Sequence, residues 1–191
     1  MHPVAGSDTA LVLGHGAGGG VGAPDLVAVT KTAIMEGISV ALVEQPYRVA
    51  GRRSQAPAPQ LDAAWISVLE QLQADELSGN AIIAGGRSAG ARVACRTASE
   101  TGAVAVLCLA FPLHPPGKGD DPTKSRLSEL EAVTVPTLVV QGENDPFGMP
   151  PEGPNRKVAR VPGNHSLRNA TAVGAAVSDW LSARVATSSP S

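Results

Sequence analysis

The sequence predicts a three-layer α/β fold with a reduced, mostly parallel sheet of about six strands and no cap domain. Short runs rich in Val, Ile and Leu recur along the chain, and they are continuous rather than alternating, as in strands buried on both faces of a parallel sheet. Segments with helical spacing separate most of these runs, which favours right-handed parallel crossovers. The expected strands cover 9–14, 38–44, 80–86, 103–111, 137–142 and 157–163, and the expected helices cover 23–37, 61–77, 91–101 and 167–185.

The first expected strand runs into a turn, "GHGAGGGVG", that is rich in glycine. Gly14, Gly16 and Gly19 formally satisfy the dinucleotide-binding pattern G-x-G-x-x-G, and Glu44 ends the next strand, where a ribose-binding acid would lie. Pro24 is the expected first helical residue, so the turn is too long for that pattern. No Gly-Lys-Ser/Thr follows, which excludes a phosphate loop. Nucleotide binding stays a weaker alternative.

The remaining composition bounds the protein class. At 191 residues with a net charge of −2, the chain predicts one domain over 1–186, a disordered tail over 187–191, and neither a nucleic-acid nor a membrane partner. The segment 143–156 carries too many Pro and Gly residues for a full helix, so the last crossover should be irregular. Cys95 and Cys108 lie in apolar segments, which is typical of buried free thiols and favours the cytoplasm. The oligomeric state is left open.

The stretch "GGRSAG" carries the strongest chemical signal. Gly86-Arg87-Ser88-Ala89-Gly90 is a G-x-S-x-G pattern between an expected strand and an expected helix. A nucleophile on so sharp a turn needs small residues two positions away on either side, because larger side chains would collide. The alternative is an ordinary glycine-rich turn. The context favours Ser88 as a nucleophile.

A nucleophilic serine needs a base and an acid that orients the base. Asp145 follows the fifth expected strand and His165 follows the sixth, in the order Ser, Asp, His. Asp145 could instead serve an Asp-Pro turn. The weaker alternatives for the acid are Glu143, Asp120 and Asp121.

Other polar residues have supporting roles in this interpretation. His15 is expected to hydrogen-bond the backbone of the loop that contains Gly16, and His114 either lines the site or braces a proline-rich loop. The four His and two Cys show no ligand spacing, so we expect neither a metal nor a cofactor. Possible contacts for a substrate carboxylate or phosphate, unless they are solvated or brace loops, are Arg48, Arg52, Arg53 and Arg87.

These motifs together resemble the α/β-hydrolase superfamily over essentially the full length. "GHGAGGG", "GGRSAG", "QGENDPFG" and "GNHSL" correspond to its oxyanion, nucleophile, acid and histidine loops. The chain is most similar to the small cap-less branch of dienelactone-hydrolase-like proteins, which includes the hydrolase-like domain of a regulatory subunit of a histone-acetyltransferase complex. The resemblance implies a first strand beside the third, with the second outside the first. Because the first apolar run already leads into the oxyanion loop, we expect this sequence to lack the antiparallel strands that usually open the fold.

The function predicted on this basis is a serine hydrolase of esterase or thioesterase type that cleaves a small acyl ester through an acyl-enzyme. The backbone N–H groups of Ala17 and Ala89 are expected to form the oxyanion hole. Few aromatic residues and no cap favour a shallow site for a small-molecule substrate. The alternative is a hydrolase-fold binding module whose triad is idle.

Overall fold

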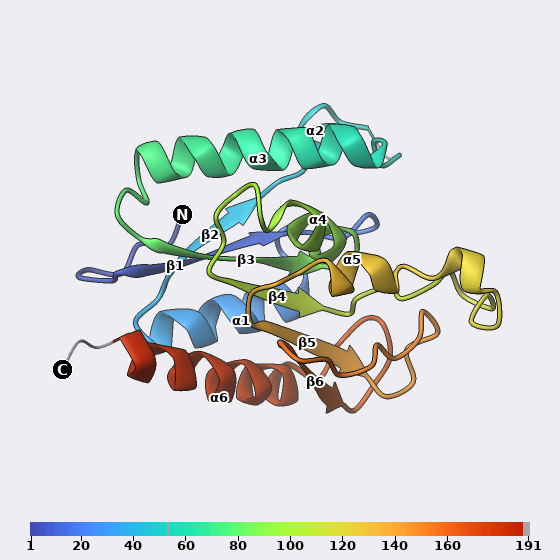
Figure 1. Ribbon diagram of the computed structural model, residues 1–191. Coiled ribbons are helices and arrows are strands. Elements are labelled where there is room, and N and C mark those ends of the chain that lie inside the picture. The colour runs from blue at the N-terminus through green and yellow to red at the C-terminus, as the bar shows by residue number, and fades with distance from the viewer. Residues whose placement is uncertain (53, 189–191) are drawn as a thin grey trace.

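The computed structural model describes residues 1–52 and 54–188, which form one six-stranded sheet flanked by helices (Figure 1). The strand order is β2-β1-β3-β4-β5-β6, and all five strand pairs are parallel. This order and the parallel pairing confirm the predicted fold class. The strands are β1 Thr9–Gly14, β2 Ser39–Val43, β3 Ala81–Arg87, β4 Ala105–Leu109, β5 Thr137–Gly142 and β6 Arg156–Val161.

Helices cover both faces of the sheet, as the continuous apolar strands require. In Figure 1, α3, α4 and α5 lie on one face, and α1 and α6 lie side by side on the other. The helices are α1 Pro24–Met35, α2 Pro46–Val49, α3 Ala58–Ala74, α4 Ala89–Thr97, α5 Leu127–Glu131 and α6 Ala170–Ser188, with one 3-10 turn at Pro122–Lys124.

Two hydrophobic cores result, one on each face. The first contains Trp65 of α3 and Phe111 beyond β4, and the second contains Leu26 of α1 and Leu181 of α6. Alternate residues of β1 to β5 feed the two cores, whereas the edge strand β6 is only partly covered and exposes Lys157 and Arg160. Burial of this apolar surface, at about 25 cal/mol per Å², is the main stabilising term of the sheet.

Differences from the predicted helices have simple causes. The short helices α2 and α5 were not predicted, because four or five residues are too few to show helical periodicity. Helix α4 starts at Ala89, two residues before its expected start, because the chain turns directly at Ser88. The β5–β6 connection contains no helix, as predicted.

The N-terminal segment keeps one antiparallel contact. His2 and Val40 form an isolated antiparallel bridge on the outer edge of β2, with N–H to O distances of 2.7 and 3.0 Å. Among the described residues this bridge is the only antiparallel pairing against the first three strands. It stands where antiparallel opening strands would continue the sheet.

The C-terminal helix extends past the predicted end of the domain. Helix α6 continues to Ser188, so residues 187 and 188 of the expected tail are helical, and residues 189–191 lie outside the described residues. Within the described part of the chain, no helix is long and apolar enough to span a membrane. No cap domain interrupts residues 54–188, and the two longest connections between their elements cover 110–121 and 143–155 (Figure 1).

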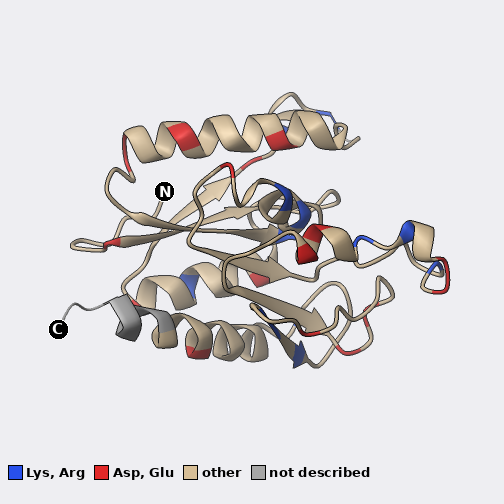
Figure 2. Ribbon diagram, in the orientation of Figure 1, with Lys and Arg blue, Asp and Glu red and all other residues tan. Residues whose placement is uncertain are grey.

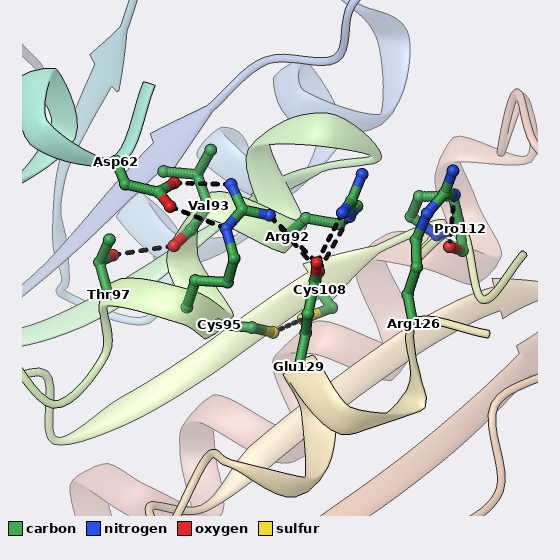
Figure 3. A network of polar contacts seen from close by, with 10 residues as sticks. Asp62, Arg92, Val93, Cys95, Thr97, Cys108, Pro112, Arg126 and Glu129 are labelled. Carbon is green, nitrogen blue, oxygen red and sulfur yellow. Dashed lines mark hydrogen bonds and ion pairs between the residues drawn. The ribbon is translucent and has the colours of Figure 1, made fainter. Parts of the chain in front are cut away.

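A charged network holds α4 between its neighbouring helices. Figure 2 shows the basic residues of α4 between acidic residues of α3 and α5. Arg92 donates to Glu129 through Nε and Nη2 at 2.8 and 2.5 Å, and Arg96 pairs with Asp62 at 2.8 and 2.6 Å (Figure 3). Nearby Arg126 donates to a backbone carbonyl, and its pKa is lowered by burial and by the repulsion of Arg92. These contacts tie α4 to α3 and α5.

Candidate active site

Ser88 lies on a strained turn between β3 and α4. Its φ is 51° and its ψ −108°, a conformation that L-residues rarely adopt. A Cβ on Gly86 would lie 2.6 Å from the carbonyl oxygen of Gly14, and one on Gly90 would meet the same carbonyl group. The backbones therefore pack too closely for any side chain at either glycine. The strain is held in place by this packing, and it projects the serine hydroxyl above the sheet.

His165 and Asp145 are brought to Ser88 from the ends of two other strands. The Ser88 Oγ lies 2.9 Å from His165 Nε2, and His165 Nδ1 lies 2.9 Å from Asp145 Oδ2. An ionised carboxylate only accepts, so Nδ1–H donates to Asp145 and Nε2 is left to accept the serine proton. The three residues predicted from separate motifs thus form one hydrogen-bonded chain.

The carboxylate of Asp145 is held by neighbours of its own loop. Gln141, which is fully buried in β5, donates to Asp145 Oδ2 at 2.9 Å, and the N–H of Phe147 donates to Oδ1 at 2.9 Å. The Asp145 side chain is only 1% exposed. The Phe147 ring also packs on the His165 ring, with centroids 4.1 Å apart. Both members of the acid–base pair therefore have a fixed orientation.

The alternative acids lie elsewhere. Glu143 is exposed beside the loop, and Asp121 accepts from the N–H and hydroxyl of Thr123 at the 3-10 turn. Asp120 is exposed as well. None of the three is hydrogen-bonded to His165.

The glycine-rich loop is fixed by a buried histidine. His15 is fully buried, its Nε2 accepts from the N–H of Gln45 at 2.9 Å, and its Nδ1 therefore donates to the carbonyl of Gly16 at 2.8 Å. Tyr47 of α2 packs edge-on to this ring and donates to the Ala17 carbonyl at 3.4 Å. These bonds hold the loop from both sides.

Two backbone N–H groups adjoin Ser88, that of Ala89 along the chain and that of Ala17 next to the Gly16 contact. A Cβ on Gly16 would lie 3.3 Å from the Ser88 Cβ, so the loop touches the nucleophile, and the next residue is Ala17. Ala89 is the first residue of α4, where an N–H has no partner within the helix. No described residue accepts a hydrogen bond from the N–H of Ala17. Both groups are free to donate to a ligand.

Arg87 is engaged in contacts between loops, which favours the bracing alternative for it, and a substrate contact stays a prediction. Its Nε donates to Asp25 Oδ2 at 2.8 Å and its Nη2 to the His165 carbonyl at 3.0 Å. Its side chain is 17% exposed, and Asp25 is fully buried. Burial raises the pKa of Asp25, which the charge of Arg87 partly opposes. Arg87 braces the loops of the site.

His114 also braces loops rather than offering a free ring. Its Nδ1 lies 2.8 Å from the Pro115 carbonyl, and its Nε2 edge lies against Gly119 and Gly148. The backbone N–H of His114 donates to the carbonyl of Phe147 in the acid loop at 3.0 Å. The ring fills the space between two loops, which favours the bracing alternative, and substrate binding by His114 stays a prediction.

The guanidinium groups of Arg48 and Arg52 are available to bind an anion. Arg48 is half-buried on α2 and Arg52 is exposed just after it, and among the described residues neither side chain has a carboxylate partner. Burial raises the pKa of Tyr47, and the nearby Arg48 guanidinium opposes that shift. Arg48 thus lies close to the tyrosine that contacts the oxyanion loop. Arg53 lies outside the described residues.

Sequence reasoning missed three residues of the site. Gln141 carried a signal, since it is a polar residue at the end of an otherwise apolar strand. Phe147 carried none beyond its place in the acid loop. Asp25 was hidden, because its partner Arg87 is 62 residues away and no spacing rule joins them.

Two further features are separate from this site. An open groove of about 860 Å³ lies between β6 and α6, and its lining, which includes Lys157 and Asp179, contains none of the candidate site residues. Within residues 1–52 and 54–188, no group of three or more His, Cys, Asp or Glu side chains is placed to hold a metal ion.

The site and the sheet together define an α/β-hydrolase. The family model of the alpha/beta hydrolase domain matches residues 7–188, and the chain belongs to this superfamily.

Solved structures share the fold at low sequence identity. The chain is similar to Est1E from Butyrivibrio proteoclasticus, solved with ferulic acid bound (TM-score 0.74, 18% identity, 97% of this chain and 94% of that one). It is also similar to the dienelactone hydrolase of Anabaena variabilis (TM-score 0.71, 19% identity, 93% of this chain and 87% of that one). A serine hydrolase without a lid from Xanthomonas campestris is similar as well (TM-score 0.68, 17% identity, 94% of this chain and 86% of that one). The lidless neighbour agrees with the predicted absence of a cap.

Proposed function

We propose that the protein is a serine hydrolase that cleaves small acyl esters or thioesters. The observation that carries this proposal is the continuous hydrogen-bonded chain from Ser88 through His165 to Asp145, which begins at a strained turn. A binding module has no need to hold a serine in such a conformation and to aim an imidazole at its hydroxyl.

The proposed reaction has two steps. His165 Nε2 takes the proton of the Ser88 hydroxyl as its oxygen attacks the substrate carbonyl, and Asp145 stabilises the imidazolium that forms. The imidazolium then gives the proton to the departing alcohol or thiol, which leaves an acyl-Ser88 ester. Water, deprotonated by the same nitrogen, hydrolyses this ester and restores the serine.

The developing oxyanion is assigned to the N–H groups of Ala17 and Ala89. One such donor is worth about 3 kcal/mol in the transition state. His15 contributes indirectly, since it fixes the carbonyl of Gly16 and with it the following peptide. The side chains at 17 and 89 therefore matter less than the path of the backbone.

We propose a small substrate with an open approach. The fold has no lid over Ser88 among the described residues, and aromatic residues make up only 3% of the chain, which disfavours a deep lipid tunnel. Arg48 and Arg52 are proposed contacts for an acidic group on such a substrate, since neither has a carboxylate partner in the described part of the chain.

A fluorophosphonate probe and short p-nitrophenyl esters test the proposal. The native protein should be labelled and should turn over the acetyl ester, and Ser88→Ala should do neither. Ser78→Ala is the matched control, because Ser78 is exposed and precedes β3, at the opposite end of that strand from Ser88. A native protein that neither labels nor hydrolyses any ester or thioester would favour the binding module instead.

A further inference from the structure

One guanidinium joins three of the loops that form the candidate site. Arg87 directly precedes Ser88, its Nε donates to Asp25 at the start of α1, and its Nη2 donates to the backbone carbonyl of His165. The remaining nitrogen, Nη1, lies 2.9 Å from the position that a Cβ on Gly16 would take. The nucleophile turn, the histidine loop and the segment after the first strand therefore meet at this side chain.

The Asp25–Arg87 pair is costly for a purely structural role. Asp25 is fully buried, so its charge loses its hydration, and one of its oxygens is used for the N–H of Leu26 at 2.9 Å. Buried ion pairs often add little stability over apolar residues of the same size, and they are retained where they fix one arrangement. Here the arrangement that is fixed includes the backbone of His165.

The geometry of His165 leaves little tolerance for a shift of its loop. Its imidazole spans two hydrogen bonds of 2.9 Å, to Ser88 on one side and Asp145 on the other. A displacement of about 1 Å lengthens one bond beyond its useful range and can lower a rate about 100-fold. The hydrogen bond from Arg87 ties the His165 backbone to the residue next to Ser88. It therefore limits the separation between the histidine and the nucleophile.

We infer that Arg87 and Asp25 are a positioning pair that holds the His165 loop in register with Ser88. The inference rests on the proposed function. Arg87 touches no reacting atom, so it acts through His165. Asp25 acts through Arg87, because it fixes the guanidinium plane and leaves Nη2 aimed at the carbonyl.

The test compares Arg87→Met, Arg87→Lys, Asp25→Asn and the double variant Asp25→Asn/Arg87→Met. Arg87→Met should lower kcat for p-nitrophenyl acetate by about 10- to 100-fold with little change in KM, because substrate contacts are kept and alignment is lost. Arg87→Lys should recover part of the loss, since an ammonium reaches one partner but not both. The double variant should be no slower than Arg87→Met, because the pair acts as one unit.

Arg92→Met is the matched control. Like Arg87→Met, it removes a guanidinium that donates two hydrogen bonds from a side chain of similar exposure, 25% against 17%. Both bonds of Arg92 go to Glu129, between α4 and α5, and neither touches His165. The control variant should lower the melting temperature to a similar extent and leave kcat unchanged. A general loss of stability therefore does not imitate the expected result.

A proton NMR measurement provides a readout that needs no turnover. The Nδ1–H of His165, hydrogen-bonded to Asp145, should give a strongly deshielded resonance in the native protein and in Arg92→Met, and this resonance should weaken or broaden in Arg87→Met. If the native protein hydrolyses the ester and a folded Arg87→Met keeps the native kcat and the native resonance, the positioning role alone is overturned. A native protein without hydrolysis or labelling overturns the proposed function and this inference with it.

Discussion

Replacing Gly90 with alanine tests whether close backbone packing creates the nucleophile turn. The new Cβ would meet the Gly14 carbonyl oxygen, and it would lie 2.6 Å from the Gly14 carbonyl carbon and 2.9 Å from the His15 carbonyl oxygen. All three atoms are backbone, so none can rotate away, and either β1 or α4 must shift. Forced overpacking of this kind costs about 2 kcal/mol. For a domain of this size, that lowers the melting temperature by about 4–8 °C.

Gly90→Ala should affect the rate of hydrolysis more strongly than it affects the free energy of unfolding. A shift of α4 moves the Ala89 N–H, and a shift of the loop moves the Ala17 N–H, so either relaxation separates the proposed oxyanion donors. Loss of one donor would reduce kcat by about 100- to 1,000-fold. Thermal unfolding by circular dichroism and hydrolysis of p-nitrophenyl acetate measure the two effects on the same sample.

The same loop supplies a matched control. A Cβ on Gly18 would meet no atom within 4 Å, and Gly18 has no positive φ, so Gly18→Ala should be neutral or stabilising by about 0.4–1 kcal/mol. Gly16→Ala should fall between the two in stability, because its closest contact is the movable tip of Arg87. Equal melting temperatures for Gly90→Ala and Gly18→Ala would refute the packing argument.

Three further predictions address the acid, the buried ion and the thiols. Asp145→Asn should lower kcat by about 10⁴-fold in a folded protein, measured by ester hydrolysis, because an amide no longer selects the His165 tautomer. Burial raises the Asp25 pKa above 3.8, so the folded state binds that proton more tightly than the unfolded state. The unfolding free energy of the native protein relative to Asp25→Asn should therefore fall as the pH rises from 3.8 to the folded pKa and stay level above it, as measured by urea unfolding; a rise across this window would contradict the assignment. Cys95 and Cys108 lie with their sulfurs 3.4 Å apart, and the pKa of Cys95 is raised well above its ordinary value by that contact and by burial, so both thiols should resist Ellman's reagent until urea unfolds the chain.

Much of the fold could be predicted from the sequence because the sheet is buried on both faces. Continuous apolar runs marked the strands, and β1 and β5 have the expected bounds. The ends of β4 were missed by two residues each, because Ala103, Val104, Ala110 and Phe111 are as apolar as the strand itself. Local composition does not show where a ladder of hydrogen bonds stops.

The candidate site was predictable where a residue has a fixed place relative to a strand end. Ser88, Asp145 and His165 each follow a strand in the order that the fold implies, and the folded chain brings them into hydrogen-bond contact. Arg87 lay in the same motif at the end of β3, but its ion pair is with Asp25, far away in the sequence on α1. Long-range polar pairing leaves no periodicity, so a single sequence offers no reason to prefer a brace over a substrate contact.

The glycine-rich loop shows how packing separates two functions that share a sequence pattern. In a dinucleotide fold the third glycine of G-x-G-x-x-G allows close contact between the helix and the strand. Gly19, at that position, has nothing within 4 Å of a would-be Cβ, and so does not serve such a contact. The glycine that lets a helix approach β1 is Gly90, which belongs to α4 and meets Gly14. The helix that β1 packs against at this point is thus α4, which directly follows Ser88. The close approach brings the glycine-rich loop to the nucleophile, as the proposed oxyanion hole requires and a pyrophosphate cradle does not.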